Sequence, residues 1–372
     1  MWDQQLRRLS ALCALAAVSC GSAAPVADDA LALGQRFGSD AEFRRGVLEQ
    51  SLAVHDNDYA RLRLVHYARD WDALPEWNPR VAPWLAGDVP LEPVWTASAP
   101  GTREEWLALG KAAFERWPAQ RMGALSAARA AALGIASGAV VRVAYTSGVE
   151  EAALSCAGCH AARGPDGELQ PGPPSDVDLA GWGAGRVDVT GDDVENPVAI
   201  PDLRAVAHQR RLHWTGNLHN GLLELAVRIE TLLITAASSA VRPPREIAFA
   251  LALYVESLGD EETSRELAAS PRGAAVFERE CGRCHAHATG AGDVVSAEEV
   301  GTDPTAAVSP ERGGAGYRVP SLFRVGERRR LLHDGSIERL DELLQPHAGG
   351  HRFGVELTAD DRASLLVFLR SL

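Results

Sequence analysis

The sequence predicts a mainly α-helical protein with little β structure. We expect two similar helical units in tandem, preceded by an irregular N-terminal extension rich in Trp and Pro. Two observations lead to this prediction. The motif Cys-x-x-Cys-His occurs twice, at residues 156–160 and 281–285. The residues around the first motif recur around the second at matching spacing, which is the pattern of an internal repeat.

The elements of the repeat can be followed along the chain. Each copy begins with a helical pattern in which Phe follows Gly by four residues, in segments 110–116 and 273–279. After each motif, a Pro-x-Leu segment precedes a Gly by the same distance, from Pro201 to Gly216 and from Pro320 to Gly335. Apolar residues at helical spacing also predict four further helices, over residues 222–233, 247–258, 337–344 and 365–372.

Smaller signals complete the layout. Thr358 is a start signal for the last helix, with Asp360 and Asp361 in its first turn. Pro346 is expected to end helix 337–344. Copy 1 carries an insertion between its first helix and its motif. Residues 139–145 in that insertion have the composition of a strand.

The Cys-x-x-Cys-His motif is the attachment signature of c-type haem. The two thiols bond to the haem vinyl groups, and the adjacent His binds the iron. A single Cys-x-x-Cys also suits zinc or redox sites, but two copies that each continue into His favour haem. The sequence therefore predicts two covalently bound c-type haems, each held by two cysteines and a histidine: Cys156, Cys159 and His160 for haem 1, and Cys281, Cys284 and His285 for haem 2.

Each copy is thus expected to form a cytochrome c-like helical haem domain. The predicted division is a signal peptide over residues 1–24, the Trp/Pro-rich N-terminal extension over 25–100, haem domain 1 over 101–260, haem domain 2 over 261–372, and a linker over 259–270. The extension fits two interpretations. It is either a flap packed on the haem domains or an apolar surface that docks a partner.

The N-terminus has the pattern of an export signal. Arg7 and Arg8 precede an apolar run over residues 9–18, which is too short for a stable membrane span. Small residues then offer two cleavage sites. Cleavage after residue 19 would leave Cys20 for lipidation, whereas ordinary cleavage would follow Ala24. We expect a periplasmic protein, or a lipoprotein anchored in the outer membrane, of a Gram-negative bacterium.

The net charge of the chain bears on which partners it can bind. The formal net charge is −13, which argues against nucleic acid as a partner. A membrane would be contacted only through the lipid on Cys20. An exported redox partner, either a small cytochrome or a cupredoxin, is expected.

Methionine is too scarce to complete both irons, because Met1 lies in the predicted signal peptide and only Met122 remains. His347, presented from a turn behind Pro346, is the predicted distal ligand of haem 2. Aligning Gly216 with Gly335 places Arg228 opposite His347, so copy 1 has no ligand there. Haem 1 is then either open to peroxide or dioxygen, or takes a ligand from elsewhere in the chain. The candidates for that ligand are His208, His213, His219 and Met122.

Several segments resemble a known superfamily. Residues 317–322 and 332–336 resemble the C-terminal half of bacterial dihaem cytochrome c peroxidases and of the related dihaem maturase of methylamine dehydrogenase. Residues 181–190 and 196–204 are most similar to the rubber-oxygenase-like branch of dihaem c-type cytochromes. The resemblance covers about residues 100–372. It implies His347 in the distal place of haem 2 and a first haem open to dioxygen.

The resemblance also implies roles for individual residues. Trp214 matches an aromatic residue that lies between the two haems and helps electrons cross. Its alternative role is a core aromatic. Glu224 stands where the peroxidases carry Gln, and Ile234 stands where they carry a catalytic Glu. Either Glu224 or Glu230 handles protons beside haem 1, or both are ordinary surface residues of the helix. The candidate catalytic residues are Trp214, Glu224 and Arg228.

Two functions follow as expectations. The first is an exported dihaem c-type cytochrome that transfers electrons. The alternative is a peroxidase- or oxygenase-type oxidoreductase that acts at haem 1 on peroxide, dioxygen or an organic substrate. A sensory module is a third class, but the sequence contains no signalling output domain.

Overall fold

The structure is a computed structural model, and most of the chain is described in it. Helices make up 45% of the protein and strands 12%, which confirms the mainly α class with little β structure. The described residues are 27–77, 80–83, 94–135, 137–144, 150–164, 166–179, 181–190, 193–259, 270–286, 290–345 and 357–372. The predicted signal peptide, Cys20, His347 and most of the predicted linker lie outside these residues.

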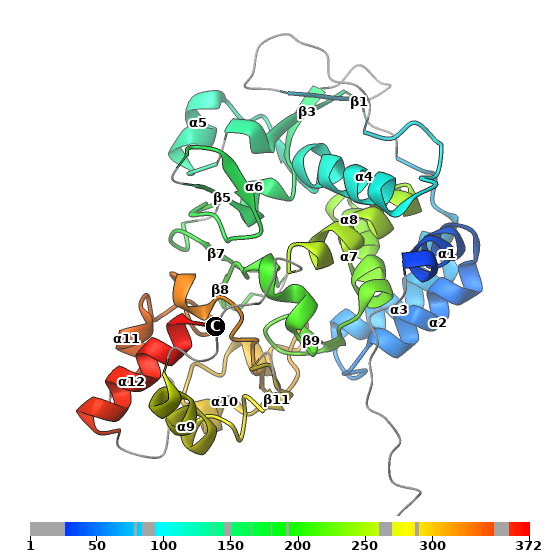
Figure 1. Ribbon diagram of the computed structural model, residues 1–372. Helices are drawn as coiled ribbons and strands as arrows, with labels where there is room; N and C mark the ends of the chain where they lie inside the picture. Colours follow the sequence, from blue (N-terminus) through cyan, green and yellow to red (C-terminus); the bar gives the residue numbers. More distant parts are fainter. Residues whose placement is uncertain are drawn as a thin grey trace, which may run out of the picture.

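The described chain begins and ends with helices, and most of the short strands lie between residues 120 and 219 (Figure 1). The α-helices are α1 (Ala27–Ser39), α2 (Ala41–Ser51), α3 (Asp58–Arg69), α4 (Arg103–Arg116), α5 (Ala127–Ala132), α6 (Ala157–His160), α7 (Leu222–Ala236), α8 (Arg245–Ser257), α9 (Pro271–Glu280), α10 (Ala297–Val300), α11 (Leu340–Leu343) and α12 (Ala359–Arg370). The 3-10 turns are η1 (Trp71–Ala73), η2 (Ser137–Ala139), η3 (Leu203–His208), η5 (Ala306–Val308) and η6 (Val325–Glu327).

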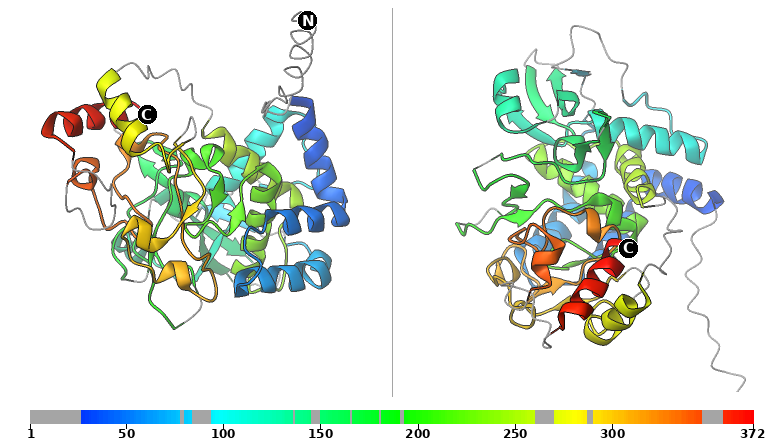
Figure 2. Two further views of the ribbon diagram at one scale, coloured as in Figure 1. Left: turned by 90° about the horizontal axis from the view of Figure 1, so that it is seen from below. Right: turned by 60° about the vertical axis from the view of Figure 1, so that its left-hand side comes forward.

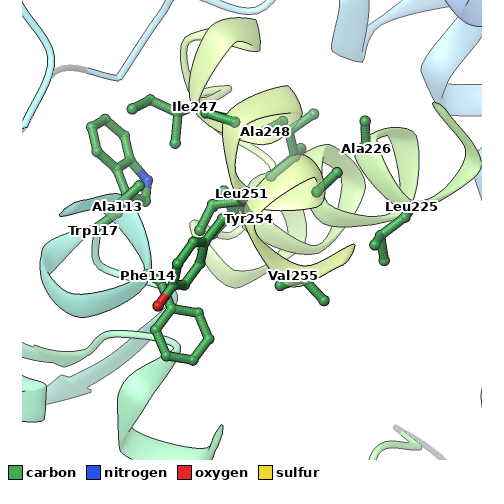
Figure 3. Close-up of a cluster of buried hydrophobic side chains, with 14 of the residues drawn as sticks. Ala113, Phe114, Trp117, Leu225, Ala226, Ile247, Ala248, Leu251, Tyr254 and Val255 are labelled. Carbon is green, nitrogen blue, oxygen red and sulfur yellow. The ribbon is translucent and has the colours of Figure 1, made fainter. Parts of the chain in front are cut away.

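In copy 1, the first helix and the closing helix cross at very close range. A β-carbon on Gly110 of α4 would lie 2.1 Å from the carbonyl oxygen of Ala250 in α8, so only glycine allows this approach. The rings of Phe114 and Tyr254 then pack beside the crossing with their centroids 5.5 Å apart. Figure 3 shows these two rings next to each other in the apolar core.

Copy 2 repeats this crossing with α9 and α12, which lie side by side in both views of Figure 2. A β-carbon on Gly273 would lie 2.1 Å from the carbonyl oxygen of Ser364. The rings of Phe277 and Phe368 lie 5.3 Å apart. The side chain of Thr358 caps α12 by accepting the N–H of Asp361, as the sequence predicts.

The insertion of copy 1 forms an antiparallel sheet in the order β1-β3-β4-β2. The strand expected over residues 139–145 is observed as β3. The strands of this sheet are β1 (Arg80–Pro83), β2 (Gln120–Gly123), β3 (Val140–Ala144) and β4 (Glu150–Leu154). Four two-stranded ladders complete the β structure: β5 (Ala161–Arg163) with β6 (Leu169–Pro171), β7 (Arg186–Val187) with β8 (Val198–Ala199), β9 (Arg211–Leu212) with β10 (Leu218–His219), and β11 (Val294–Val295) with β12 (Tyr317–Arg318).

The prediction of an irregular N-terminal extension is wrong for its first part. Residues 27–69 form α1, α2 and α3, which pack beside α7 and α8 (Figure 1). Two caps define these helices. The Asp40 side chain accepts the N–H of Phe43, and the Asn57 side chain accepts the N–H of Ala60. Because their apolar faces are buried, the three helices belong to the main core.

The buried apolar side chains form two large clusters, which lie on either side of the predicted domain boundary. The first runs from Phe37 to Val255 and includes residues of α2, α3, α4, α7 and α8. The second runs from Val276 to Leu369 and is centred on α9 and α12. A smaller cluster that includes Val198, Tyr317 and Trp214 lies where the two copies meet.

The four helices predicted over 222–233, 247–258, 337–344 and 365–372 all form with different bounds, as α7, α8, α11 and α12. Helix 337–344 is reduced to α11, because Ile337 pairs with Leu331 in an antiparallel bridge. Helix 222–233 continues to Ala236 as α7. In the part of the chain that the structure describes, no helix is long and apolar enough to cross a membrane.

Candidate haem-binding sites

The first Cys-x-x-Cys-His motif lies where the sheet of copy 1 ends. Strand β4 stops at Leu154, Cys156 is the N-cap of α6, and the rest of the motif forms that short helix. Cys156, Cys159 and His160 all line one cavity of about 380 Å³, which we call cavity 1. Its volume lies within the range of small-molecule and cofactor pockets.

A backbone carbonyl holds the imidazole of His160 in place. Its Nδ1 donates to the carbonyl oxygen of Pro201 at 3.2 Å, which leaves Nε2 as the nitrogen available to a ligand. Burial lowers the pKa of His160 to about 4, so the ring is neutral at pH 7. A neutral imidazole with its second nitrogen held by a carbonyl is the usual form of a metal-binding histidine.

The second motif follows α9 directly, and Cys281 is the C-cap of that helix. Cys281, Cys284 and His285 line a second cavity of about 220 Å³, which we call cavity 2. Nδ1 of His285 donates to the carbonyl oxygen of Gly290. The carbonyl of Pro320 also acts on this ring and raises its pKa against the lowering by burial. The Pro-x-Leu segment therefore meets the motif histidine in both copies.

Burial acts against activation of three motif thiols, those of Cys156, Cys159 and Cys281. Burial raises the pKa of Cys156 and of Cys281 to about 12, and that of Cys159 to about 11. Catalytic Cys-x-x-Cys pairs need the opposite shift, because the thiolate is the reactive form. A thioether carries no charge, so burial opposes a redox function here and suits covalent attachment to an apolar group.

These residues fit covalent haem. In each copy two cysteine side chains and one neutral, oriented imidazole line the same cavity. Cys156 and Cys159 with His160 would hold one haem, and Cys281 and Cys284 with His285 would hold the other.

Trp214 lies between the two cavities and lines both of them. Its Nε1–H donates to the carbonyl oxygen of Ala199 at 2.7 Å, which fixes the orientation of the indole. Arg318 also lines both cavities, and its guanidinium carbon lies 5.0 Å from the centroid of the Trp214 ring. The indole therefore occupies a position from which it could contact a group in either cavity.

One face of α7 forms a wall of cavity 1. Its members follow helical spacing: Leu225, Arg228, Ile229 and Leu232. The predicted site residue Arg228 is therefore in the cavity, whereas Glu224 is not among the lining residues. At about 100° per residue, Glu230 points to the opposite side of α7. It is only 1% exposed there, and its carboxylate accepts a hydrogen bond from the Tyr67 hydroxyl at 2.7 Å.

Of the four candidates for a distal ligand in copy 1, only His213 lines cavity 1. Both of its ring nitrogens are engaged. Nδ1 donates to Asn217 Oδ1 at 2.7 Å, and Nε2 accepts the Nε–H of Arg228 at 2.6 Å. His208 instead bonds the carbonyl oxygen of Gly259. His219 and Met122 do not line the cavity.

Cavity 2 contains a histidine that sequence reasoning did not select. His333 is buried in its wall and stacks on Tyr317 with ring centroids 3.9 Å apart. The sequence did contain a signal for this residue. When Gly216 is aligned with Gly335, His333 takes the position in copy 2 that Trp214 has in copy 1. Arg312 in the wall of cavity 1 was missed as well, because it belongs to a loop of copy 2.

Comparison with known proteins does not add to this picture. No protein-family model matches the chain, and no curated protein is significantly similar to it.

Proposed function

We propose that the protein is an exported dihaem c-type cytochrome that passes electrons between two covalently attached haems. The observation that supports this most directly is the position of Trp214, whose indole lines both motif-containing cavities. An aromatic ring between two cofactors shortens the gap that an electron must cross.

The residues of the chain have separate tasks in this proposal. The cysteines of each motif anchor one haem, and His160 and His285 bind the irons from one side. Haem, when bound, supplies an iron that gains and loses one electron. The carbonyls of Pro201 and Gly290 orient the two imidazoles. The hydrogen bond from Trp214 to Ala199 holds the indole between the cavities.

The predicted partner is an exported small cytochrome or cupredoxin. The proposed location is the periplasm, or the outer membrane if Cys20 is lipidated. The export pattern of residues 7–24 supports both locations. His347 remains the proposed distal ligand of haem 2.

A second candidate function is an oxidoreductase that acts on peroxide, dioxygen or an organic substrate at haem 1. Cavity 1 favours it in two ways. It has the larger volume, 380 Å³ against 220 Å³. In addition, His213, the histidine that lines this cavity besides His160 among the described residues, has both ring nitrogens engaged in hydrogen bonds. This function would distinguish the two haems, whereas simple electron transfer would not.

Intact mass spectrometry tests the first proposal. The full chain should be produced in a host competent for cytochrome maturation. We expect a mass that exceeds the mature polypeptide by two haems. Replacing both motif cysteines by Ala, at Cys156 and Cys159 or at Cys281 and Cys284, should remove one haem each. A colourless product with the bare polypeptide mass would refute the proposal.

Carbon monoxide separates the two candidate functions. Added to the reduced protein, it should change the spectrum of one haem of the two if haem 1 is catalytic. No change at either haem favours electron transfer alone.

A further inference from the structure

We propose that the end of cavity 1 formed by Arg228 and Arg312 binds a carboxylate. The proposal names a ligand chemistry for the cavity assigned to haem 1, and to that extent it rests on the proposed function. It is carried by unsatisfied hydrogen-bond donors, by uncompensated positive charge and by a wall that holds both in place.

Cavity 1 is lined by several hydrogen-bond donors that have no acceptor among the described residues. Five residues that line cavity 1 each have a buried polar atom without a hydrogen-bond partner in the described part of the chain. Every one of these atoms can donate a proton, and four of them can only donate. An acceptor ligand would satisfy them, and a buried donor left unpaired is costly. The atoms are Arg228 Nη1, Arg312 Nε, Arg318 Nε, Asn196 Nδ2 and Thr215 Oγ1.

Positive charge accumulates beside Arg228 and Arg312. Three guanidinium groups surround the ring of Tyr59, with their central carbons 3.5, 6.0 and 5.3 Å from its centroid for Arg63, Arg228 and Arg312. Arg63 is only 5% exposed. Within the described residues, none of the three forms an ion pair with a carboxylate. Buried like charges without a counterion destabilise a protein, so a bound anion would relieve the cost.

The local electrostatics agree with this geometry. Burial, followed by the charge of Arg228, lowers the pKa of Arg312 to about 10. Glu311 is the acidic side chain that acts in the other direction on both Arg63 and Arg312. The effect of Glu311 on these pKa values is smaller than that of burial. Glu311 therefore does not remove the stabilisation that a bound anion would give to the three arginines.

Hydrogen bonds hold the arginines in position. The Nε–H of Arg228 donates to Nε2 of His213, so Nη1 of Arg228 stays available for a ligand. His213 in turn bonds Asn217, whose Nδ2 donates to the carbonyl oxygen of Arg312 at 3.2 Å. Behind them, the ring of Tyr59 contacts the His213 ring edge-on at 5.0 Å. Helix α3 of the N-terminal extension therefore supports the site.

A carboxylate matches this end better than a small spherical anion. The planar guanidinium forks pair with the two oxygens of a carboxylate. The neighbouring wall is apolar, with Leu225, Ile229 and Leu232 on the face of α7. The ligand would thus carry its charge at one end of an apolar body. Two sources have this chemistry: a propionate of the bound haem, or a dissolved apolar carboxylic acid.

The test uses the haem-loaded full chain and isothermal titration calorimetry with benzoate, with uncharged benzamide as the matched ligand. If the site takes a dissolved acid, benzoate binds saturably and benzamide does not. Binding should weaken roughly tenfold to a hundredfold in Arg228→Met and in Arg312→Met. Arg228→Lys should recover part of it. Arg129→Met, at an exposed position of α5, is the matched control and should bind like the unchanged protein.

The second arm detects a propionate. If haem already fills the site, added benzoate does not bind. The reduction potential of one haem should then become dependent on pH between about pH 5 and 7 in the Met variants, because the freed propionate loses its charge partners and its pKa rises. The unchanged protein and Arg129→Met should lack this dependence.

Absence of both effects would overturn the carboxylate site. Intact mass of the same preparations reports haem attachment independently. Loss of the dihaem assignment and loss of the carboxylate site are therefore separate results.

Discussion

Gly110 and Gly273 occupy the same place in two different helix crossings. Each lies against a carbonyl oxygen of the partner helix, that of Ala250 in α8 and that of Ser364 in α12. The aromatic residue four positions later packs on a ring of the partner helix in both copies. The repeat in the sequence is therefore also a repeat in helix packing. Each Cys-x-x-Cys-His motif follows the first helix of such a crossing.

This relationship predicts a large effect of a single methyl group. In Gly110→Ala the new β-carbon would meet the carbonyl of Ala250, so the helices must separate. We expect a loss of about 1–3 kcal/mol in the free energy of unfolding, measured by guanidinium denaturation. Gly46→Ala in α2 is the matched control, because a β-carbon there contacts nothing within 4 Å. It should stabilise by about 0.5–1 kcal/mol. Equal effects of the two substitutions would contradict the close crossing.

Trp214 should govern electron transfer between the haems. Trp214→Leu removes the ring from between the cavities, and with it the hydrogen bond to Ala199. Interhaem transfer should slow, as followed by flash photolysis or stopped-flow reduction of the haem-loaded protein. Trp95→Leu removes a buried Trp that lines neither motif cavity and should leave the rate unchanged. The bridge role is excluded if both variants transfer electrons at the original rate.

Tyr67 should stabilise the contact between α3 and α7. Tyr67→Phe leaves the buried carboxylate of Glu230 without its hydroxyl donor, while Arg245 remains 3.4 Å away. An unpaired buried acceptor costs about 1–3 kcal/mol in the free energy of unfolding. Tyr254→Phe is the control, since its hydroxyl forms no hydrogen bond to the described residues, and it should change stability by less than about 0.5 kcal/mol. Carbon monoxide binding should not change in either variant.

Acid should weaken the fold through His213. Burial, followed by the charges of Arg228 and Arg312, holds the pKa of His213 well below 6.5. As pH falls below about 6.5, the unfolded chain takes up a proton that the folded chain does not, so the free energy of unfolding falls. His333 acts in the same direction, because burial lowers its pKa too.

Replacing His213 isolates its share of this pH dependence. Its backbone has a φ of 59°, a conformation that Asn tolerates, so His213→Asn keeps the local geometry. Denaturation at pH 7.5 and at pH 5.5 should show a smaller loss on acidification in the variant. An identical loss in both proteins would assign the effect to other groups.

Local patterns in the sequence predicted much of the frame. The Gly and Phe spacing predicted the helices that became α4 and α9, and Thr358 predicted the start of α12. The helical period alone separates Glu230 from Arg228, because it turns Glu230 away from the face that carries Arg228. It does not separate Glu224 from Arg228, since residues four apart share a helix face.

Other features depend on contacts between distant parts of the chain and leave no local signature. Arg312 reaches cavity 1 from a loop of copy 2, and Tyr59 of α3 contacts Arg312 and His213 in its wall from behind. The helices of the extension had readable caps at Asp40 and Asn57. That they would pack into the core of copy 1 could not be read from their own residues.

The hydrogen bonds of α3 have a consequence for biogenesis. The backbone N–H groups of Asp58 and Tyr59 donate to the carbonyls of Pro310 and Glu311, and Asn57 bonds the carbonyl of Gly313, 256 positions further along. Chains are synthesised from the N-terminus, so α3 is made long before these acceptors exist. The start of α3 can therefore form these hydrogen bonds only after most of the polypeptide has left the ribosome.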